Sequence, residues 1–189
     1  MHATEKDHMW QADSASMFTF GGGWFLIAVD VFTRFTRAAP MANTTAAEAV
    51  RVFRTWDPPP QILDTDGGRE FKDVFHDHLE KEGIQHQVRS GYSINALAVA
   101  DRKIQQLKKA ISGAMMEDET AHWIRLVPDI VTGLNESPTE ALHGKAPEDI
   151  QSEEAIFDIQ KAQAERAEKS TAKFDKQVSA VERVGQCEQ

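Results

Sequence analysis

The sequence predicts an α/β protein in which helices cover a five-stranded mixed sheet and a helical extension follows. Short apolar runs bounded by turn residues dominate the first part of the chain and are typical of strands. Further along, segments with apolar residues at helical spacing alternate with strands, a pattern that favours a layered α/β fold. The chain has 189 residues, of which 41% are hydrophobic. That size suits one domain with an extension.

Three strands are predicted at residues 10–18, 24–32 and 34–40, and they form a meander. A run of three glycines starting at Gly21 makes the turn between the first two. The later elements are predicted from apolar spacing and from terminators such as Gly83. They are, in order, a helix from the Asn43–Thr45 cap to about Trp56, a strand at 61–63, a helix at 69–82, a strand at 84–89, a loop at 90–97, and helices over about 98–116 and about 119–134.

Composition divides the chain into a lead-in at residues 1–9, a catalytic-type core at 10–150 and a charged helical extension at 151–189. The extension is rich in Ala, Gln, Glu and Lys, so we expect a solvated helix or helix pair that needs a partner. The net charge of −9 argues against a protein that coats nucleic acid. Residues 99–112, however, carry a net charge of +3, so any contact with nucleic acid is expected to be local.

The single cysteine, Cys187, excludes a disulfide within the chain and a Cys-x-x-Cys zinc pattern. No signal-peptide pattern and no apolar run of membrane-spanning length is present. We therefore expect an intracellular protein, in the nucleus or cytoplasm, with no membrane partner.

Three acidic residues are the strongest candidates for chemistry. Asp13 ends the run Trp10-Gln11-Ala12-Asp13, Asp66 follows a buried strand in Leu63-Asp64-Thr65-Asp66-Gly67-Gly68, and Asp101 opens a basic helix. Carboxylates brought together from strand and helix ends can hold two divalent cations, and two cations can drive displacement at a phosphodiester. The chemistry requires Asp13 and Asp66 to lie side by side.

Each carboxylate also has a simpler interpretation. Asp13 can be an exposed polar strand position, Asp66 part of a turn, and Asp101 a helix cap. Asp64 shares a strand face with Asp66 and is a rival ligand. Glu70 is interpreted as a helix-start residue and not as a ligand.

Histidines are interpreted as surface residues because none has metal-ligand spacing with cysteine. His76 and His78 are two apart on a predicted helix and do not face each other. His86 is assigned to the same class.

In order along the chain, several motifs resemble the catalytic core of retroviral-type integrases, which occur in retroviruses and LTR retrotransposons. The resemblance covers residues 10–150 and rests on Trp10-Gln11-Ala12-Asp13, Phe25-Leu26-Ile27-Ala28-Val29-Asp30-Val31-Phe32-Thr33-Arg34, Thr65-Asp66-Gly67-Gly68-Arg69-Glu70-Phe71, Gly83-Ile84-Gln85-His86, Trp123 with Leu126, Asn135, and Gly144-Lys145-Ala146-Pro147-Glu148. By analogy, Asp30 is structural.

The resemblance implies an RNase H-like fold and a metal-dependent polynucleotidyl transferase of a retroelement. Such an enzyme integrates DNA by 3′-end processing and strand transfer, with the element ends and target DNA as partners and a homo-oligomer as the working form. Two Mg²⁺ or Mn²⁺ ions are expected, with Asp13 bridging both, Asp66 completing one site and Asp101 the other.

The chain departs from the family pattern at the third acid. The usual Glu is Asp101, which makes an Asp-Asp-Asp variant of the Asp-Asp-Glu triad; Ile104 and Gly67 each replace an Asn. An Asp is one methylene shorter than Glu, and misplacement on the order of 1 Å costs about a hundredfold in rate.

Basic and amide residues follow Asp101 on the same predicted helix. Lys103, Gln105 and Lys108 are candidates for nucleic-acid contact, with Lys108 two turns along the face of Asp101. A solvated basic face is the alternative.

Two other functions stay open. The first is a catalytically degenerate core that acts as a nucleic-acid or protein binding module. The second is an RNase H-like nuclease, which usually needs a further acid close to the first, and residues 14–22 contain none.

Overall fold

The computed structural model describes residues 5–89, 97–162 and 164–165. The chain divides into two compact units, Met1–Ile150 and Gln151–Gln189. The loop predicted at residues 90–97 lies outside the described residues except for Leu97. No described helix has the length and apolar character to cross a membrane.

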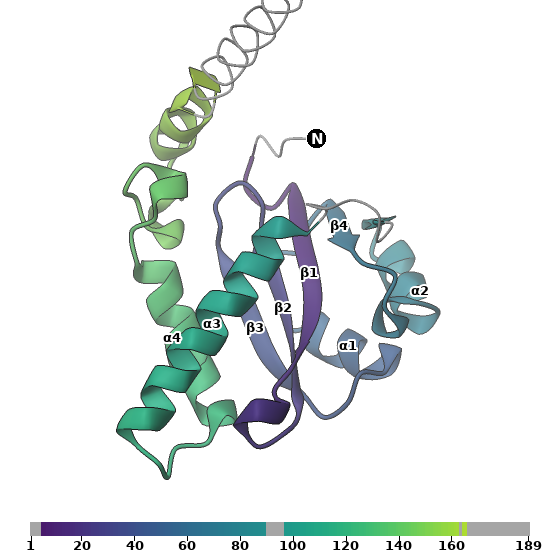
Figure 1. Ribbon diagram of the computed structural model, residues 1–189. Helices are drawn as coiled ribbons and strands as arrows, with labels where there is room; N and C mark the ends of the chain where they lie inside the picture. Colours follow the sequence, from purple (N-terminus) through teal and green to yellow (C-terminus); the bar gives the residue numbers. More distant parts are fainter. Residues whose placement is uncertain (1–4, 90–96, 163, 166–189) are drawn as a thin grey trace, which may run out of the picture. The chain divides into compact units, whose positions relative to one another are not determined.

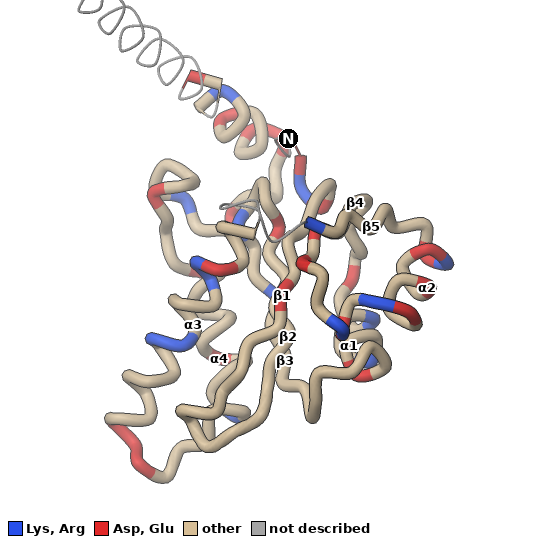
Figure 2. The backbone as a smooth tube through the Cα atoms, turned by 45° about the vertical axis from the view of Figure 1, so that its right-hand side comes forward, with Lys and Arg blue, Asp and Glu red and all other residues tan. Residues whose placement is uncertain are grey.

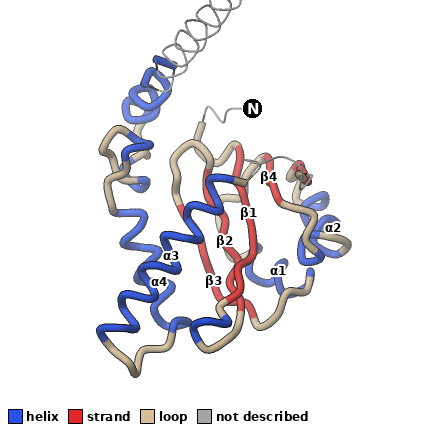
Figure 3. Tube along the Cα trace, viewed as in Figure 1, coloured by secondary structure: helices blue, strands red, loops and turns tan. Residues whose placement is uncertain are grey.

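A single five-stranded sheet forms the centre of the first unit (Figure 3). Its strands stand in the order β3-β2-β1-β4-β5, with β2 antiparallel to β1 and β3, and β4 parallel to β1 and β5. This is the mixed sheet that the sequence predicted. The strands are β1 (Met9–Ser16), β2 (Trp24–Asp30), β3 (Thr36–Met41), β4 (Ile62–Thr65) and β5 (Gln85–Val88).

Helices cover both faces of the sheet (Figure 1). The long helix α3 (Ala98–Glu117) and α4 (Trp123–Glu136) cover one face, and α1 (Ala46–Phe53) and α2 (Val74–Lys81) cover the other. Strand β2 supplies both cores by alternation, because successive side chains in a strand point to opposite faces. Its odd positions pack with α3 and α4 and its even positions with α1 and α2; they are Phe25, Ile27 and Val29, and Leu26 and Ala28.

Two side chains of α4 attach it to the sheet region. The buried amide of Asn135 accepts a hydrogen bond from Thr36 N at 2.8 Å and donates one to Thr36 O at 2.9 Å, which satisfies the backbone of edge strand β3. The Trp123 indole donates to Gly22 O at 2.9 Å. Gly23, at φ +93°, packs so tightly that a Cβ there would lie 2.9 Å from the Trp123 ring. Both the conformation and the space at residue 23 therefore require glycine.

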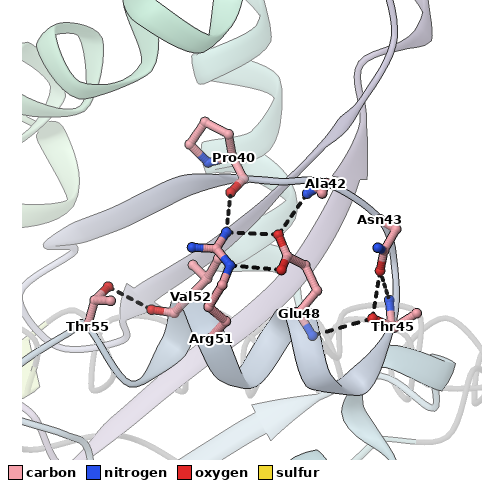
Figure 4. Close-up of polar contacts among 8 residues, drawn as sticks. All are labelled: Pro40, Ala42, Asn43, Thr45, Glu48, Arg51, Val52 and Thr55. Carbon is pink, nitrogen blue, oxygen red and sulfur yellow. Dashed lines mark hydrogen bonds and ion pairs between the residues drawn. The ribbon is translucent and has the colours of Figure 1, made fainter.

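The start of α1 is fixed by side chains, as the sequence predicted from its Asn-Thr-Thr cap (Figure 4). The Thr45 hydroxyl accepts from Glu48 N, and Asn43 Oδ1 accepts from the Thr45 backbone at 3.0 Å. Glu48 forms two 2.8 Å bonds with the Arg51 guanidinium and accepts from Ala42 N at 2.8 Å. These contacts hold α1 against the chain that leaves β3.

The helix predicted at residues 69–82 is divided in two. A 3-10 turn, η2 (Arg69–Phe71), comes first, and α2 starts only at Val74. Between them Asp73 has φ +47°, a left-handed conformation that a right-handed helix cannot contain. Apolar spacing alone does not reveal this break, since Phe71 and Phe75 both reach the core, with ring centroids 5.3 Å apart.

The second unit contains a helix over residues 153–162, in agreement with the helical extension predicted from the sequence. The Ser152 hydroxyl accepts from Ala155 N at 3.1 Å at the beginning of this helix.

Candidate active site

The register of β1 and β4 places the first two candidate acids beside each other. These parallel strands pair Trp10 with Leu63 and Gln11 with Asp64. The paired residues end there, and Asp13 and Asp66 each follow two positions later on their own segments, near enough for the charge of Asp66 to act on Asp13. Neighbouring strands lie ~4.8 Å apart. Asp13 is inside β1 and not at its end, whereas Asp66 comes directly after β4.

Gln11 connects β1 with the beginning of α3. Its Oε1 accepts hydrogen bonds from Val99 N at 3.1 Å and Ala100 N at 3.4 Å. These are backbone donors in the first turn of α3, which have no partner within the helix. Asp101 lies in the same turn, so the bonds bring the third candidate acid to β1. Sequence reasoning did not assign Gln11 a role, although a polar residue in a buried strand was a signal.

Burial and neighbouring carboxylates raise the pKa of Asp13 from its usual 3.8 to about 7. Desolvation is the largest cause, and the hydrogen bond from Ser14 N, at 2.7 Å, opposes it. The negative charges of Asp66, Asp101 and Glu70 raise the pKa further. Asp13 therefore lies within electrostatic range of the other two predicted acids and of Glu70.

Asp66 is exposed at the beginning of a tight turn, and its Oδ1 accepts from Gly68 N at 2.8 Å. The Thr65 hydroxyl donates to Asp66 O at 2.9 Å and lies 2.8 Å from His86 Nε2. A hydroxyl has one hydrogen to donate. His86 Nε2 is therefore the donor to Thr65, which links β5 to the backbone that carries Asp66.

The histidine interpretation needs a correction. His86 is half-buried, and its Nδ1 lies 3.0 Å from Nδ1 of His76. Because Nε2 of His86 carries a proton, its Nδ1 accepts from His76 in the neutral ring. His76 is an exposed residue as predicted, but the pairing joins α2 to β5 and depends on contacts that sequence spacing does not show.

Asp64, the rival ligand, is engaged elsewhere. It is fully buried, and its Oδ2 accepts from Arg89 at 2.7 Å. Its other oxygen has no hydrogen-bond partner in the described part of the chain. The ion pair with Arg89 makes Asp64 a structural acid.

Glu70 was interpreted as a helix-start residue, and it does lie in the first turn of η2, but its side chain makes a contact that the sequence did not predict. It is 8% exposed, and its carboxylate accepts a hydrogen bond from the Ser14 hydroxyl on β1. No spacing rule connects residues 14 and 70, so the sequence did not reveal the contact.

The three candidates for nucleic-acid contact differ in exposure. Gln105 is exposed and Lys108 is partly exposed, while Lys103 is only 8% exposed. Burial, followed by the positive charge of Arg34, lowers the pKa of Lys103. Lys103 is poorly placed to reach a phosphate and drops out of the proposed contact set. Basic positions recur along α3 (Figure 2).

The donor chemistry of the site fits a hard divalent cation. Asp13, Asp66 and Asp101 offer carboxylate oxygens, which Mg²⁺ prefers. The pKa of Asp13 is raised mainly by burial and further by the neighbouring carboxylates, and a bound cation would favour its charged form. Within the described residues, however, no group of three His, Cys, Asp or Glu side chains is arranged to hold a metal ion.

Solved structures with the same architecture are retroviral. A chain of the simian T-cell lymphotropic virus intasome, in complex with PP2A regulatory subunit B56 gamma, matches with a TM-score of 0.72 and 17% identity over 78% of this chain. The HTLV-2 integrase catalytic core domain in complex with magnesium, in its trimeric form, matches with a TM-score of 0.66 and 16% identity over 77% of this chain. The fold is that of a retroviral integrase catalytic core.

The BIV integrase catalytic core domain also matches, with a TM-score of 0.63 and 19% identity over 76% of this chain. The matches cover 97% of the HTLV-2 core chain and 93% of the BIV core chain, but only 55% of the simian virus chain. No protein-family model and no curated protein matches the sequence. At these identities the likeness establishes the integrase-type fold.

Proposed function

We propose that the chain is a metal-dependent polynucleotidyl transferase of the integrase type. It would process the 3′ ends of a retroelement's DNA and join them to target DNA. The observation that supports it is the approach of three acids: Asp13 and Asp66 each come two residues after the paired Gln11 and Asp64, and Gln11 bonds the first turn of α3, which contains Asp101. The integrase-type fold supports it.

Asp13 would serve both ion positions, with Asp66 completing one and Asp101 the other. When bound, two divalent cations activate the attacking oxygen and stabilise the leaving oxygen. Asp13 must lose its proton for this role, so the raised pKa gives way as the cations bind. On α3, Gln105 and Lys108 would hold the DNA backbone.

DNA and further copies of the chain are the proposed partners. Solved integrase cores of HTLV-2 are described in dimeric and trimeric forms, and the simian virus chain in an intasome. Joining two DNA ends in concert requires more than one active site, which supports self-assembly here as well.

The test is a plasmid-nicking and strand-transfer assay with the full chain in Mn²⁺ and in Mg²⁺. Asp13→Asn and Asp66→Asn should abolish product, because each removes a charged oxygen ligand. Asp77→Asn is the matched control, since Asp77 is an exposed acid on α2. Equal activity in wild type and Asp13→Asn would sink the proposal.

The second candidate is a degenerate core that binds nucleic acid or protein. It is favoured by the lack, among the described residues, of a ready three-ligand group. DNA binding that persists in EDTA, combined with no nicking in either ion, is the outcome that selects it.

A further inference from the structure

Glu70 and Ser14 join the two segments that carry the strand carboxylates. Ser14 follows Asp13 on β1, and Glu70 comes four residues after Asp66 in η2. The Ser14 hydroxyl donates a hydrogen bond to Glu70 Oε1 across 56 positions of sequence. The contact is therefore a tertiary link at the candidate site.

Glu70 is a buried carboxylate in the short 3-10 helix η2. No side chain caps η2, and Glu70 is 8% exposed. Burying a carboxylate is unfavourable unless it is hydrogen-bonded or paired. The hydroxyl of Ser14 supplies such a hydrogen bond to the Glu70 carboxylate.

Gly68 brings the carboxylates of Asp66 and Glu70 toward one point. A Cβ at residue 68 would lie 2.8 Å from Asp66 Oδ1 and 2.8 Å from Glu70 Oε2. Gly68 has φ −55°, which any residue adopts, so a side chain at residue 68 would act only by displacing these two carboxylate ends. Its N–H also donates to Asp66 Oδ1.

The backbone ladder does not fix the spacing of the acids. Pairing between β1 and β4 ends at Gln11 and Asp64, two residues before Asp13 and Asp66. Past this point, the Ser14–Glu70 hydrogen bond is a link between the two diverging segments.

We propose that the Ser14–Glu70 hydrogen bond sets the spacing of Asp13 and Asp66 for binding divalent cations, which makes Glu70 a positioning residue of the site. This inference rests on the proposed function.

Calorimetric titration of the full chain with Mn²⁺ alone tests the link. Ser14→Ala and Glu70→Ala should each weaken Mn²⁺ binding about tenfold, the scale of a hydrogen bond to a charged group. Ser14→Thr retains the hydroxyl and should stay within about twofold of wild type. Glu80→Gln, which removes an exposed charge on α2, is the matched control and should leave binding unchanged.

A second measurement separates positioning from general stability. Urea unfolding in EDTA gives the free energy of unfolding for each variant, and the fold loss in Mn²⁺ affinity is compared with it. If Glu70→Ala does not fold, Glu70→Gln replaces it, because its amide oxygen still accepts from Ser14; a smaller loss than in Ser14→Ala is expected.

The two proposals fail in different ways. Wild-type Mn²⁺ affinity in Ser14→Ala and Glu70→Ala, with binding lost in Asp13→Asn, overturns the positioning role alone. Independent, additive losses in the Ser14→Ala/Glu70→Gln double variant do the same. No Mn²⁺ binding that depends on Asp13 overturns the metal-dependent function together with this inference.

Discussion

Asp30 and Asp13 lie on neighbouring antiparallel strands, and burial raises the pKa of both, yet their surroundings differ. Asp30 is fully buried and accepts from three backbone groups, Phe32 N at 2.7 Å, Thr33 N at 2.8 Å and Asp7 N at 2.5 Å. Asp13 accepts from Ser14 N. One acid closes a turn, while the other retains oxygens for a ligand.

Asp30 and Asp13 also differ in the charged groups that surround them. Asp30 acts on the guanidinium groups of Arg34 and Arg37, whose pKa values are lowered mainly by burial and raised by its charge. Asp13 instead lies near three other carboxylates. The contrast indicates that burial alone does not identify a functional acid. The three nearby carboxylates are what distinguish Asp13 from Asp30.

The largest expected effect is at the structural acid. Asp30→Ala leaves three backbone N–H groups without their acceptor, and each buried orphan costs about 1–3 kcal/mol. We expect a loss of about 4 kcal/mol in the free energy of unfolding, measured by urea denaturation at pH 7. A loss below about 1 kcal/mol would mean that water accepts the hydrogen bonds of these N–H groups in place of the carboxylate. The contrast between a structural Asp30 and Asp13 would then no longer hold.

When no metal is present, the ionised form of Asp13 is expected to destabilise the fold, whereas the Asp30 carboxylate stabilises it. Its folded pKa is about 7 and its usual value 3.8, so the native state binds the extra proton between these values. Stability should therefore fall as pH rises from 5 to 8, by on the order of 3 kcal/mol, and Asp13→Asn should remove this fall.

Urea unfolding in EDTA at several pH values measures the difference. Asp77→Asn is the control and should retain the wild-type slope, because Asp77 is exposed on α2. Adding Mn²⁺ should restore wild-type stability at pH 8, since a bound cation replaces the proton. A fall of equal size in Asp13→Asn would contradict the assignment of the pH dependence to Asp13.

The sequence predicts the parts of the candidate site that depend on local motifs, but not the contacts between residues far apart in the chain. Asp13, Asp66 and Asp101 were proposed from local sequence motifs, and pairing of β1 with β4 brings the segments that carry the first two together. The Gln11 link to α3 and the Ser14–Glu70 bond join residues 88 and 56 positions apart. No local pattern encodes such pairs.

The remaining differences have equally specific causes. The break at Asp73 depends on a left-handed backbone conformation, which apolar spacing does not report. Lys103 was predicted beside nucleic acid because it follows Asp101, but the rotation of α3 on the sheet buries it. Helix rotation is set by packing against β1 and β2, and charge counts along the chain carry no information about it.

Substitutions at Asp101 test whether its carboxylate lies at the right distance to bind a cation. Asp101→Glu extends the carboxylate by one methylene and should raise Mn²⁺-dependent nicking by about tenfold to a hundredfold if the short side chain limits activity. The measurement is the nicking rate under single-turnover conditions in Mn²⁺ and Mg²⁺. Asp101→Asn should abolish activity.

The increase in nicking rate in Asp101→Glu should be larger in Mg²⁺ than in Mn²⁺, because Mg²⁺ tolerates distorted geometry poorly. Equal rates for wild type and Asp101→Asn would remove Asp101 from the ligand set. An inactive Asp101→Glu that still binds two ions would place the defect elsewhere, with Ile104 as the next residue to change.

The smallest expected effect separates two lysines of α3 that differ in burial. Lys108 is partly exposed, so Lys108→Ala should weaken DNA binding several-fold, by roughly 1 kcal/mol, and lower the slope of log affinity against log salt by about 1. Lys103→Ala should leave that slope unchanged, because Lys103 is 8% exposed, and should alter the free energy of unfolding instead. Fluorescence anisotropy at several salt concentrations, with urea unfolding in parallel, distinguishes the two. A lower salt slope in Lys103→Ala would show that α3 turns on the sheet when DNA binds, and the burial of this lysine would then describe only the free protein.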